Sequence, residues 1–195
     1  MDKNNHTILT ELIGRVHLLK PSQLQQITDE CEIKPFHKQQ HITETGKKDL
    51  NEYFLLDGIV HRYTLQEKGE FITTGFYKGP TIITPNFART SDQKSIFSLQ
   101  ALVPSVFAII PVDKLDELRT STPEIRRWGQ RVVEQELKNA FIHETGFRSS
   151  NAKERLLRLR NEYPNLENLV PHTCIASYIG VTPVSFSRLR KELTR

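Results

Sequence analysis

The sequence contains few of the residues that mark several common classes of protein. It has two cysteines, Cys31 and Cys174, among 195 residues. Two thiols are too few for a disulfide framework, a cysteine-rich zinc site or an iron–sulfur cluster. No apolar run approaches the length needed to span a bilayer, and the polar start of the chain does not resemble a signal peptide. We therefore expect a cytoplasmic protein without membrane contacts and without a bound metal.

Recognisable catalytic motifs are also missing. The sequence has no P-loop, no dinucleotide fingerprint and no nucleophile elbow, and its seven histidines do not form a ligand set with acidic residues. An enzyme is therefore the least favoured class. Hydrophobic residues make up 37% and charged residues 26% of the chain, which is typical of a folded protein of one or two domains.

Charge is distributed unevenly along the chain. Residues 1–120 contain 14 Lys and Arg against 15 Asp and Glu, whereas residues 121–195 contain 13 against 8. A basic C-terminal third favours a partner that is a polyanion, such as nucleic acid. A solvated basic helix face is the simpler alternative, so the sequence pattern has to decide between them.

The hydrophobic pattern changes twice along the chain. Two short helical segments come first, and residues 33–112 then alternate as short strands, with a hairpin signal at Asp57-Gly58. From Thr122 the pattern is helical again. We expect an α+β protein whose N-terminal part is a jelly roll, or double-stranded β-helix. We divide the chain into a β-roll (1–120), a long helix (121–146) and a C-terminal helical domain (147–195).

The long helix begins with a strong start signal. Thr122, Pro123 and Glu124 supply a capping hydroxyl, a proline in the first turn and an acid near the positive end of the dipole. We expect this helix to end near Glu144, with Gly146 as its cap and a hinge at 147–150. Its apolar stripe would either pack on the β-roll or form a dimer seam. We favour a homodimer through Ile125, Trp128, Val132, Val133, Leu137 and Phe141.

The next helix begins with a cap-and-return pair, Asn151 and Glu154. Three arginines decorate it, and we favour a solvated face over direct DNA contact for Arg155, Arg158 and Arg160.

The most specific signal lies between His172 and Lys191. Ala176 is small where two helices would cross, Gly180 suits a turn with positive φ, and Thr182-Pro183 would cap and open a second helix. This pattern predicts a helix-turn-helix, and an ordinary helical hairpin is the alternative.

The exposed face of the second helix would contact double-stranded DNA. Arg188 is the candidate for a bidentate contact to guanine, Val184 for a thymine methyl, and Thr173 for a phosphate at a helix N-terminus. Two copies related by a dyad would read half-sites about one helical turn apart. The full set of candidates is Thr173, Thr182, Val184, Ser185, Ser187, Arg188, Arg190 and Lys191.

Three segments together resemble the Crp/Fnr family of transcription regulators, and in particular its short-winged members of the Bacteroidetes type. The resemblance implies a cyclic-nucleotide-binding β-roll followed by a winged helix. It also implies a homodimer acting on palindromic promoter DNA, with RNA polymerase as a further partner. The segments that carry it are 54–63, 151–156 and 175–183.

The ligand motif of that family is degenerate in this chain. The family's phosphate-binding cassette begins with Gly-Glu and ends in Arg-Ser or Arg-Thr. Here Pro80 follows Gly79, and Lys94 takes the place of the arginine before Ser95, so the acid is lost and a point charge replaces a bidentate guanidinium. Ile96 would also crowd the pocket. We expect no cofactor and no response to cyclic AMP, and a smaller anion remains open as the ligand of Gly79, Thr81, Lys94 and Ser95.

Two functions from different classes follow from these observations. The first is a dimeric, sequence-specific DNA-binding regulator. The second is a small-molecule sensing module, for a cyclic nucleotide or another anion, whose C-terminal helices mainly mediate protein contacts. A steep salt dependence of DNA binding would distinguish them, because phosphate contacts release counterions.

Overall fold

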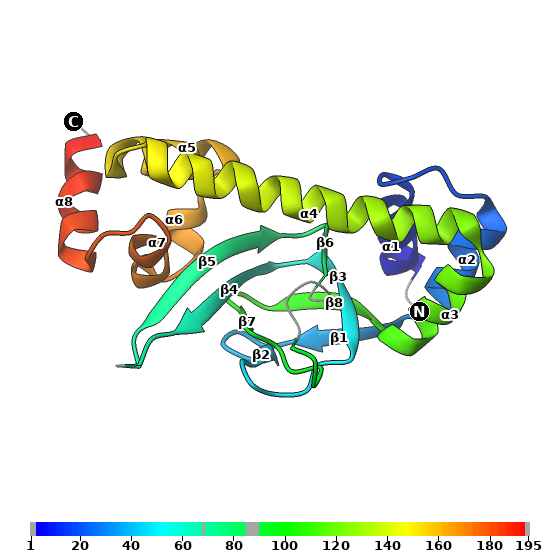
Figure 1. Cartoon of the computed structure of the whole chain (residues 1–195). Helices are drawn as coiled ribbons and strands as arrows, with labels where there is room; N and C mark the ends of the chain where they lie inside the picture. Colours follow the sequence, from blue (N-terminus) through cyan, green and yellow to red (C-terminus); the bar gives the residue numbers. More distant parts are fainter. Residues whose placement is uncertain (1–2, 68, 85–89, 194–195) are drawn as a thin grey trace.

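The computed structural model describes residues 3–67, 69–84 and 90–193 (Figure 1). They form a β-roll with helices at one end, a long helix that runs beside the roll, and a helical C-terminal unit. In chain order the elements are α1 Lys3–Gly14, α2 Pro21–Asp29, β1 Glu32–Phe36, β2 His41–Thr43, β3 Asn51–Asp57, β4 Ile59–Leu65, β5 Phe71–Lys78, β6 Thr81–Ile83, β7 Ser98–Ala101, β8 Ser105–Pro111, α3 Val112–Ser121, α4 Pro123–Ser149, α5 Ala152–Glu162, α6 Leu166–Leu169, α7 His172–Tyr178 and α8 Pro183–Leu193.

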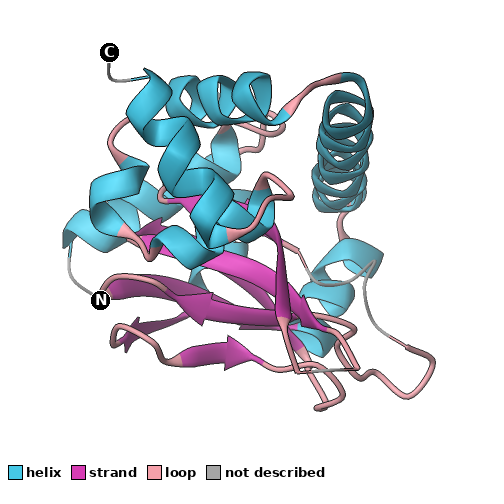
Figure 2. Ribbon diagram, turned by 90° about the vertical axis from the view of Figure 1, so that its left-hand side faces the viewer, coloured by secondary structure: helices cyan, strands magenta, loops and turns pink. Residues whose placement is uncertain are grey.

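Two four-stranded antiparallel sheets make up the roll, and the strands lie together on one side of the molecule (Figure 2). Their strand orders are β1-β8-β3-β6 and β2-β7-β4-β5. The core between them is built from alternating apolar residues of both sheets, as expected for a jelly roll. Its buried members include Phe36, Leu55, Val60, Leu99 and Phe107. The predicted α+β class with an N-terminal β-roll is confirmed.

The turn at Asp57-Gly58 lies where we expected it, but the predicted hairpin is wrong. The strands on its two sides belong to different sheets: β3 pairs with β6 and β8, whereas β4 pairs with β5 and β7. Gly58 has a φ of 111°, and a Cβ at this position would overlap the side chain of Ser105. Gly58 therefore lies at the corner where the chain passes from one sheet to the other. Glycine is required there because a side chain would be strained at this φ and would overlap Ser105.

The first half of α4 belongs to the core of the same chain. Ile125, Trp128 and Val132 are buried against α1, α2, α3 and strands of the roll. The indole of Trp128 is 1% exposed, and its Nε1–H donates to the carbonyl of Ile13 at 3.0 Å. Our assignment of these three residues to a dimer interface is therefore wrong. The sequence pattern showed an apolar face, and α1 covers that face within the protomer.

The second half of α4 is longer than we predicted. The helix continues to Ser149, so the expected end near Glu144 and the expected hinge from Phe147 are both wrong. Gly146 lies inside the helix and is buried, and a Cβ there would overlap the guanidinium of Arg158. This glycine permits a close side-chain approach rather than a left-handed cap. The break between α4 and α5 is confined to Ser150 and Asn151.

The C-terminal unit consists of helices in the part that the structure describes. No strand follows Pro111 among those residues, so the wing implied by the family resemblance is missing there. The predicted start of α5 is confirmed, because Asn151 Oδ1 accepts from the amide of Glu154 and the Glu154 carboxylate accepts from the amide of Asn151. Among the described residues, no helix combines the length and the apolar character needed to cross a membrane.

The anchoring of α4 gives a stability prediction. Replacing Trp128 by Ala should lower the free energy of unfolding by about 3–5 kcal/mol, because it leaves a large cavity and removes the hydrogen bond from the indole to the Ile13 carbonyl. Urea unfolding followed by far-ultraviolet circular dichroism would measure the change. Leu157→Ala, at an exposed apolar position of α5, is the matched control and should cost less than about 1 kcal/mol. Equal effects of the two substitutions would contradict the role given to Trp128.

Candidate nucleic-acid interface

Helices α7 and α8 and the turn between them have the geometry of a helix-turn-helix. Gly180 in the turn has a φ of 72°, and the amide of Val181 donates to the carbonyl of Ala176 at 2.9 Å. Thr182 caps α8, since its hydroxyl accepts from the amide of Ser185 at 3.1 Å. The apolar core of this unit includes Leu156, Leu159, Cys174, Ile175, Ala176, Ile179 and Phe186, and it is continuous with Ile59, Phe76 and Leu102 of the roll. The features that we read from the sequence in this segment are therefore present.

One face of α8 is exposed at the end of the molecule farthest from α1 (Figure 1). Val184 is 62% exposed, and Phe186 on the opposite face is buried. Arg188 is exposed and makes no hydrogen bond or ion pair with another residue in the part of the chain that the structure describes, so its guanidinium is free to meet a ligand. This face can be reached by a duplex. Its exposed side chains from our candidate set are Val184, Ser185, Ser187, Arg188 and Lys191.

Two other candidates have intramolecular roles. The Arg190 guanidinium lies 2.7 Å from the Glu167 carboxylate and packs over the ring of Phe186. Burial alone would raise the pKa of Glu167, but the hydrogen bonds and charges of Arg160 and Arg190 outweigh it and hold that pKa below its ordinary value. Arg190 thus attaches α8 to α6, and the Thr182 hydroxyl is used by the cap.

Arg155 has a structural role that the sequence pattern did not indicate. Its guanidinium donates to the carbonyls of Ile179 at 2.8 Å, Phe147 at 3.1 Å and Ser150 at 2.6 Å, and it stacks on the Phe147 ring at 4.4 Å. One side chain therefore joins the end of α4, the linker and the helix-turn-helix turn. The expectation of a solvated face is wrong for this residue, because the three acceptors come together only when the helices are packed.

The first helix of the pair, α7, rests on the edge of the roll. The Ser177 hydroxyl accepts from the amide of Thr73 at 2.9 Å and donates to the carbonyl of Phe71 at 3.1 Å. Both partners lie on β5, the edge strand of its sheet, whose outer backbone groups have no neighbouring strand. The ring of Tyr178 packs against Phe76 of β5 with 5.1 Å between ring centroids. This contact holds α7 against the edge of the roll.

A buried imidazole lies behind that contact. His61 of β4 is hydrogen-bonded through Nδ1 to Thr73 Oγ1 and through Nε2 to Gln100 Oε1, and its ring stacks on Tyr63 at 4.9 Å. Burial lowers the pKa of His61, the hydrogen bond that its ring donates to the Gln100 amide oxygen opposes this, and the charge of His41 lowers the pKa further. The neutral imidazole is therefore the form that fits the folded protein.

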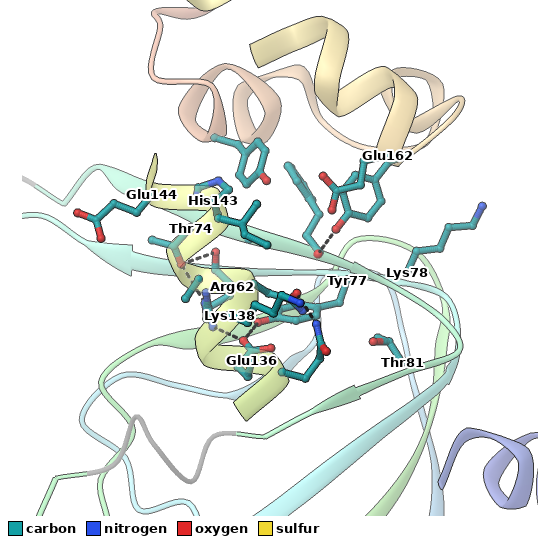
Figure 3. A pocket seen from close by; sticks show the side chains of 18 of the residues that line it. Arg62, Thr74, Tyr77, Lys78, Thr81, Glu136, Lys138, His143, Glu144 and Glu162 are labelled. Atoms are coloured by element: carbon teal, nitrogen blue, oxygen red, sulfur yellow. Dashed lines mark hydrogen bonds and ion pairs between the residues drawn. The ribbon is translucent and has the colours of Figure 1, made fainter. Parts of the chain in front are cut away.

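A cavity of about 1540 Å³ lies between the roll and the second half of α4 (Figure 3). Of the residues that we expected to hold a ligand, Thr81 lines it. Lys94 and Ser95 do not, and the Ser95 hydroxyl is buried and donates to the carbonyl of Phe97 at 2.7 Å. Gly79 allows close approach to the backbone of Asp57, where a Cβ would lie 2.8 Å from Cα. The predicted anion site is therefore not assembled.

Ile96 does not crowd the cavity as we expected, because its side chain is 53% exposed and lies outside the cavity lining. The centre of the cavity instead contains an ion pair between Arg62 of β4 and Glu136 of α4, with 3.1 Å between nitrogen and oxygen. No local pattern in the sequence indicates this pairing, since its members are 74 residues apart. Among the residues that the structure describes, no cluster of three or more His, Cys, Asp or Glu side chains has the arrangement of a metal site.

A β-roll, a long connecting helix and an exposed helix-turn-helix together define the architecture of DNA-binding regulators in which one helix joins the two parts. No family model matches the chain. Two curated regulators are similar to it, each over 88% of this chain and 72% of its own length. They are Electron transport regulator A of Shewanella oneidensis, 27% identical, and the Fumarate and nitrate reduction regulatory protein of Vibrio cholerae, 28% identical.

Solved structures of regulators have the same fold. FixK2 from Bradyrhizobium japonicum matches with a TM-score of 0.72 at 17% identity, covering 84% of both chains. The c-di-GMP responsive regulator CLP of Xanthomonas campestris also gives 0.72, at 11% identity over 90% of this chain and 92% of its own. A crp/fnr-family structure from Eubacterium rectale gives 0.71 at 15% identity, over 90% and 84%. Together with the curated relatives, these matches support a regulator of the Crp/Fnr type.

The depressed pKa of His61 predicts that acid weakens the fold. As the pH falls below the ordinary imidazole pKa of 6.5, the unfolded chain takes up a proton before the folded chain does. The free energy of unfolding should therefore fall between about pH 7.5 and the lowered folded-state pKa, and His143, whose pKa burial also lowers, adds to the same trend. Urea unfolding at several pH values would measure the slope.

His61→Gln keeps a hydrogen-bonding side chain without the titration, so it should flatten this pH dependence. His37→Gln, at an exposed imidazole, is the matched control and should leave the slope unchanged. A His61→Gln variant with the wild-type slope would contradict the assignment.

Proposed function

We propose that this protein is a dimeric, sequence-specific DNA-binding transcription regulator of Crp/Fnr type that does not respond to cyclic AMP. The observation that carries the proposal is the exposed face of α8, with Ser185, Ser187 and Arg188 presented at the end of the molecule. Short hydroxyl side chains and a free guanidinium on a helix of this kind suit phosphates and base edges in a major groove. The basic balance of residues 121–195 supplies the attraction that is independent of sequence.

In this proposal the chain has three working parts. Residues 1–120 form the sensor, the helix that begins at Pro123 connects and dimerises, and the unit after Ser149, where α4 ends, reads DNA. Within that unit, Thr173 and Lys191 would meet phosphates, Val184 a thymine methyl, and Arg188 a guanine. The absence of strands among residues 112–193 supports a short-winged member of the family. Acting at promoters would place the protein in the cytoplasm, in contact with RNA polymerase.

The dimer in this proposal uses the second half of α4. Leu137 and Phe141 are 58% and 70% exposed, and with the half-buried Val133 they follow one another at intervals of four residues. Large apolar side chains that recur on one face of a long helix are typical of a helix–helix seam. A two-fold axis between two such helices would position the two copies of α8 so that they contact two half-sites on one side of a duplex.

The second candidate function, a sensing module whose C-terminal helices contact proteins, draws support from the size of the cavity beside α4. It differs from the regulator in one measurable respect. A protein-contact module would show weak DNA binding with a shallow salt dependence, whereas a reader that neutralises several phosphates shows a steep one.

Arg188→Ala should weaken binding to the preferred DNA site by about 1–3 kcal/mol and relax base preference at one position in each half-site. The measurement is a fluorescence anisotropy titration at two salt concentrations, with DNA selected by the wild-type protein from a genomic library. Lys191→Ala is the comparison, and it should weaken binding to all sequences alike and reduce the salt slope. Unchanged affinity and unchanged base preference in Arg188→Ala would refute the role of this residue.

Phe141→Glu should convert the dimer to monomers, because it places a charge on the apolar face of α4 that the seam would bury. Sedimentation velocity at micromolar concentration would show the change. Gln135→Glu, on the opposite face of the same helix, is the control and should remain dimeric. A wild-type protein that sediments as a monomer would contradict the dimer.

A further inference from the structure

The carboxylate of Glu136 reaches from the middle of α4 into the roll. Its Oε1 accepts two charged or polar donors, Arg62 Nη1 at 3.1 Å and the Tyr77 hydroxyl at 3.1 Å. The Arg62 and Glu136 side chains are only 17% and 15% exposed. Hydrogen bonds that involve ions and are shielded from water are the strong ones, so this contact differs from the exposed ion pairs elsewhere on the surface.

Arg62 is held in place before any carboxylate meets it. Its Nε donates to Thr74 Oγ1 at 3.2 Å, and its guanidinium lies 5.7 Å from the ring centroid of Tyr77 and 5.5 Å from that of Phe97. Two aromatic faces and one hydroxyl fix the plane of the guanidinium and leave Nη1 directed at the helix. Burial also raises the pKa of the Tyr77 hydroxyl, so it remains a donor at neutral pH.

The position of this contact on α4 is informative. The helix is buried in the core as far as Val132, and most of its residues from Glu134 to Glu144 are exposed. Glu136 and His143 are the half-buried polar residues of this stretch, and Glu136 connects it to strands β4 and β5 (Figure 3). The other charged side chains labelled around the cavity, including Lys138 and Glu144, are exposed.

We propose that Arg62, Thr74 and Tyr77 form a carboxylate-binding site of the roll, and that its resident ligand is Glu136 of the same chain. The roll would then be attached to α4 by an internal carboxylate instead of a diffusible effector. Any small anion that entered the cavity would have to displace Glu136 from Arg62. An effect of this attachment on DNA binding rests on the proposed function, whereas the attachment of α4 to the roll does not.

The test is chemical rescue. In Glu136→Ala, the backbone amides of α4 between residues 133 and 145 should exchange with deuterium at least about tenfold faster than in the wild type. Formate or acetate should restore most of the protection by filling the vacated site, and chloride at the same ionic strength should not. Glu134→Ala removes the same charge from an exposed position of the same helix and should exchange like the wild type.

Two further variants keep the test decisive. Glu136→Gln preserves the shape of the side chain, so it replaces Glu136→Ala in the test if the alanine variant does not fold. Its α4 amides should exchange faster than those of the wild type, but by a smaller factor than in Glu136→Ala. Arg62→Met removes the receptor of the carboxylate, so formate should not restore its protection. Wild-type exchange in Glu136→Ala and Glu136→Gln, or equal rescue of Arg62→Met by formate, would overturn the proposal.

DNA binding is measured in parallel without added small molecules. The proposal expects the wild type to bind DNA and Glu136→Ala to bind it at least about tenfold more weakly. That result would support an internal ligand that holds the protein in its DNA-binding arrangement. A wild type that binds DNA only after a small anion is added would overturn it. If no variant binds DNA but formate still restores protection, the proposed function fails while the carboxylate site stands.

Discussion

Helix α4 is shared by two parts of the molecule, and the burial of Trp128 fixes its direction. The indole lies 1% exposed between α1 and the roll, with its N–H donated to the carbonyl of Ile13. A rigid helix of 27 residues that is held at one end carries its other end to a defined place. The position of the helix-turn-helix relative to the roll therefore depends on how the first turns of α4 pack, about twenty residues before α5 begins.

Three further contacts refine that position, and all of them are polar. Glu136 binds Arg62 in the cavity, Ser177 binds the free edge of β5, and Arg155 joins the end of α4 to the helix-turn-helix turn. Polar contacts between parts of a chain exchange readily with water, whereas an apolar core does not. The roll and the C-terminal helices also share one apolar cluster, in which Ile59 and Phe76 of the roll pack with α5, α7 and α8. The polar contacts therefore adjust a junction that apolar packing holds together.

Local signals in the sequence were reliable where the chemistry is local. The caps at Asn151 and Thr182 and the positive φ of Gly180 were predicted from a few neighbouring residues, and the structure contains them. Helix α6 and strand β6 were missed, since segments of a few residues carry little periodicity. Helix α3 was missed because Leu115 is its one buried residue, so its sequence has no apolar face of helical period. Trp128 was assigned to the wrong partner, because a helical pattern shows which face is apolar and not what covers it.

By itself, the sequence determined that a β-roll, a long helix and a helix-turn-helix follow one another in this order. It also determined that Ser185 and Arg188 lie on the exposed face of the last helix. Hydrogen bonds and side-chain periods within a few residues decide those features. Only the tertiary structure decided that Arg62 meets Glu136, that Arg155 gathers three carbonyls, and that Lys94 and Ser95 lie outside the cavity. Such contacts join residues far apart in the chain, and they exist because packing of the apolar cores brings their backbones together.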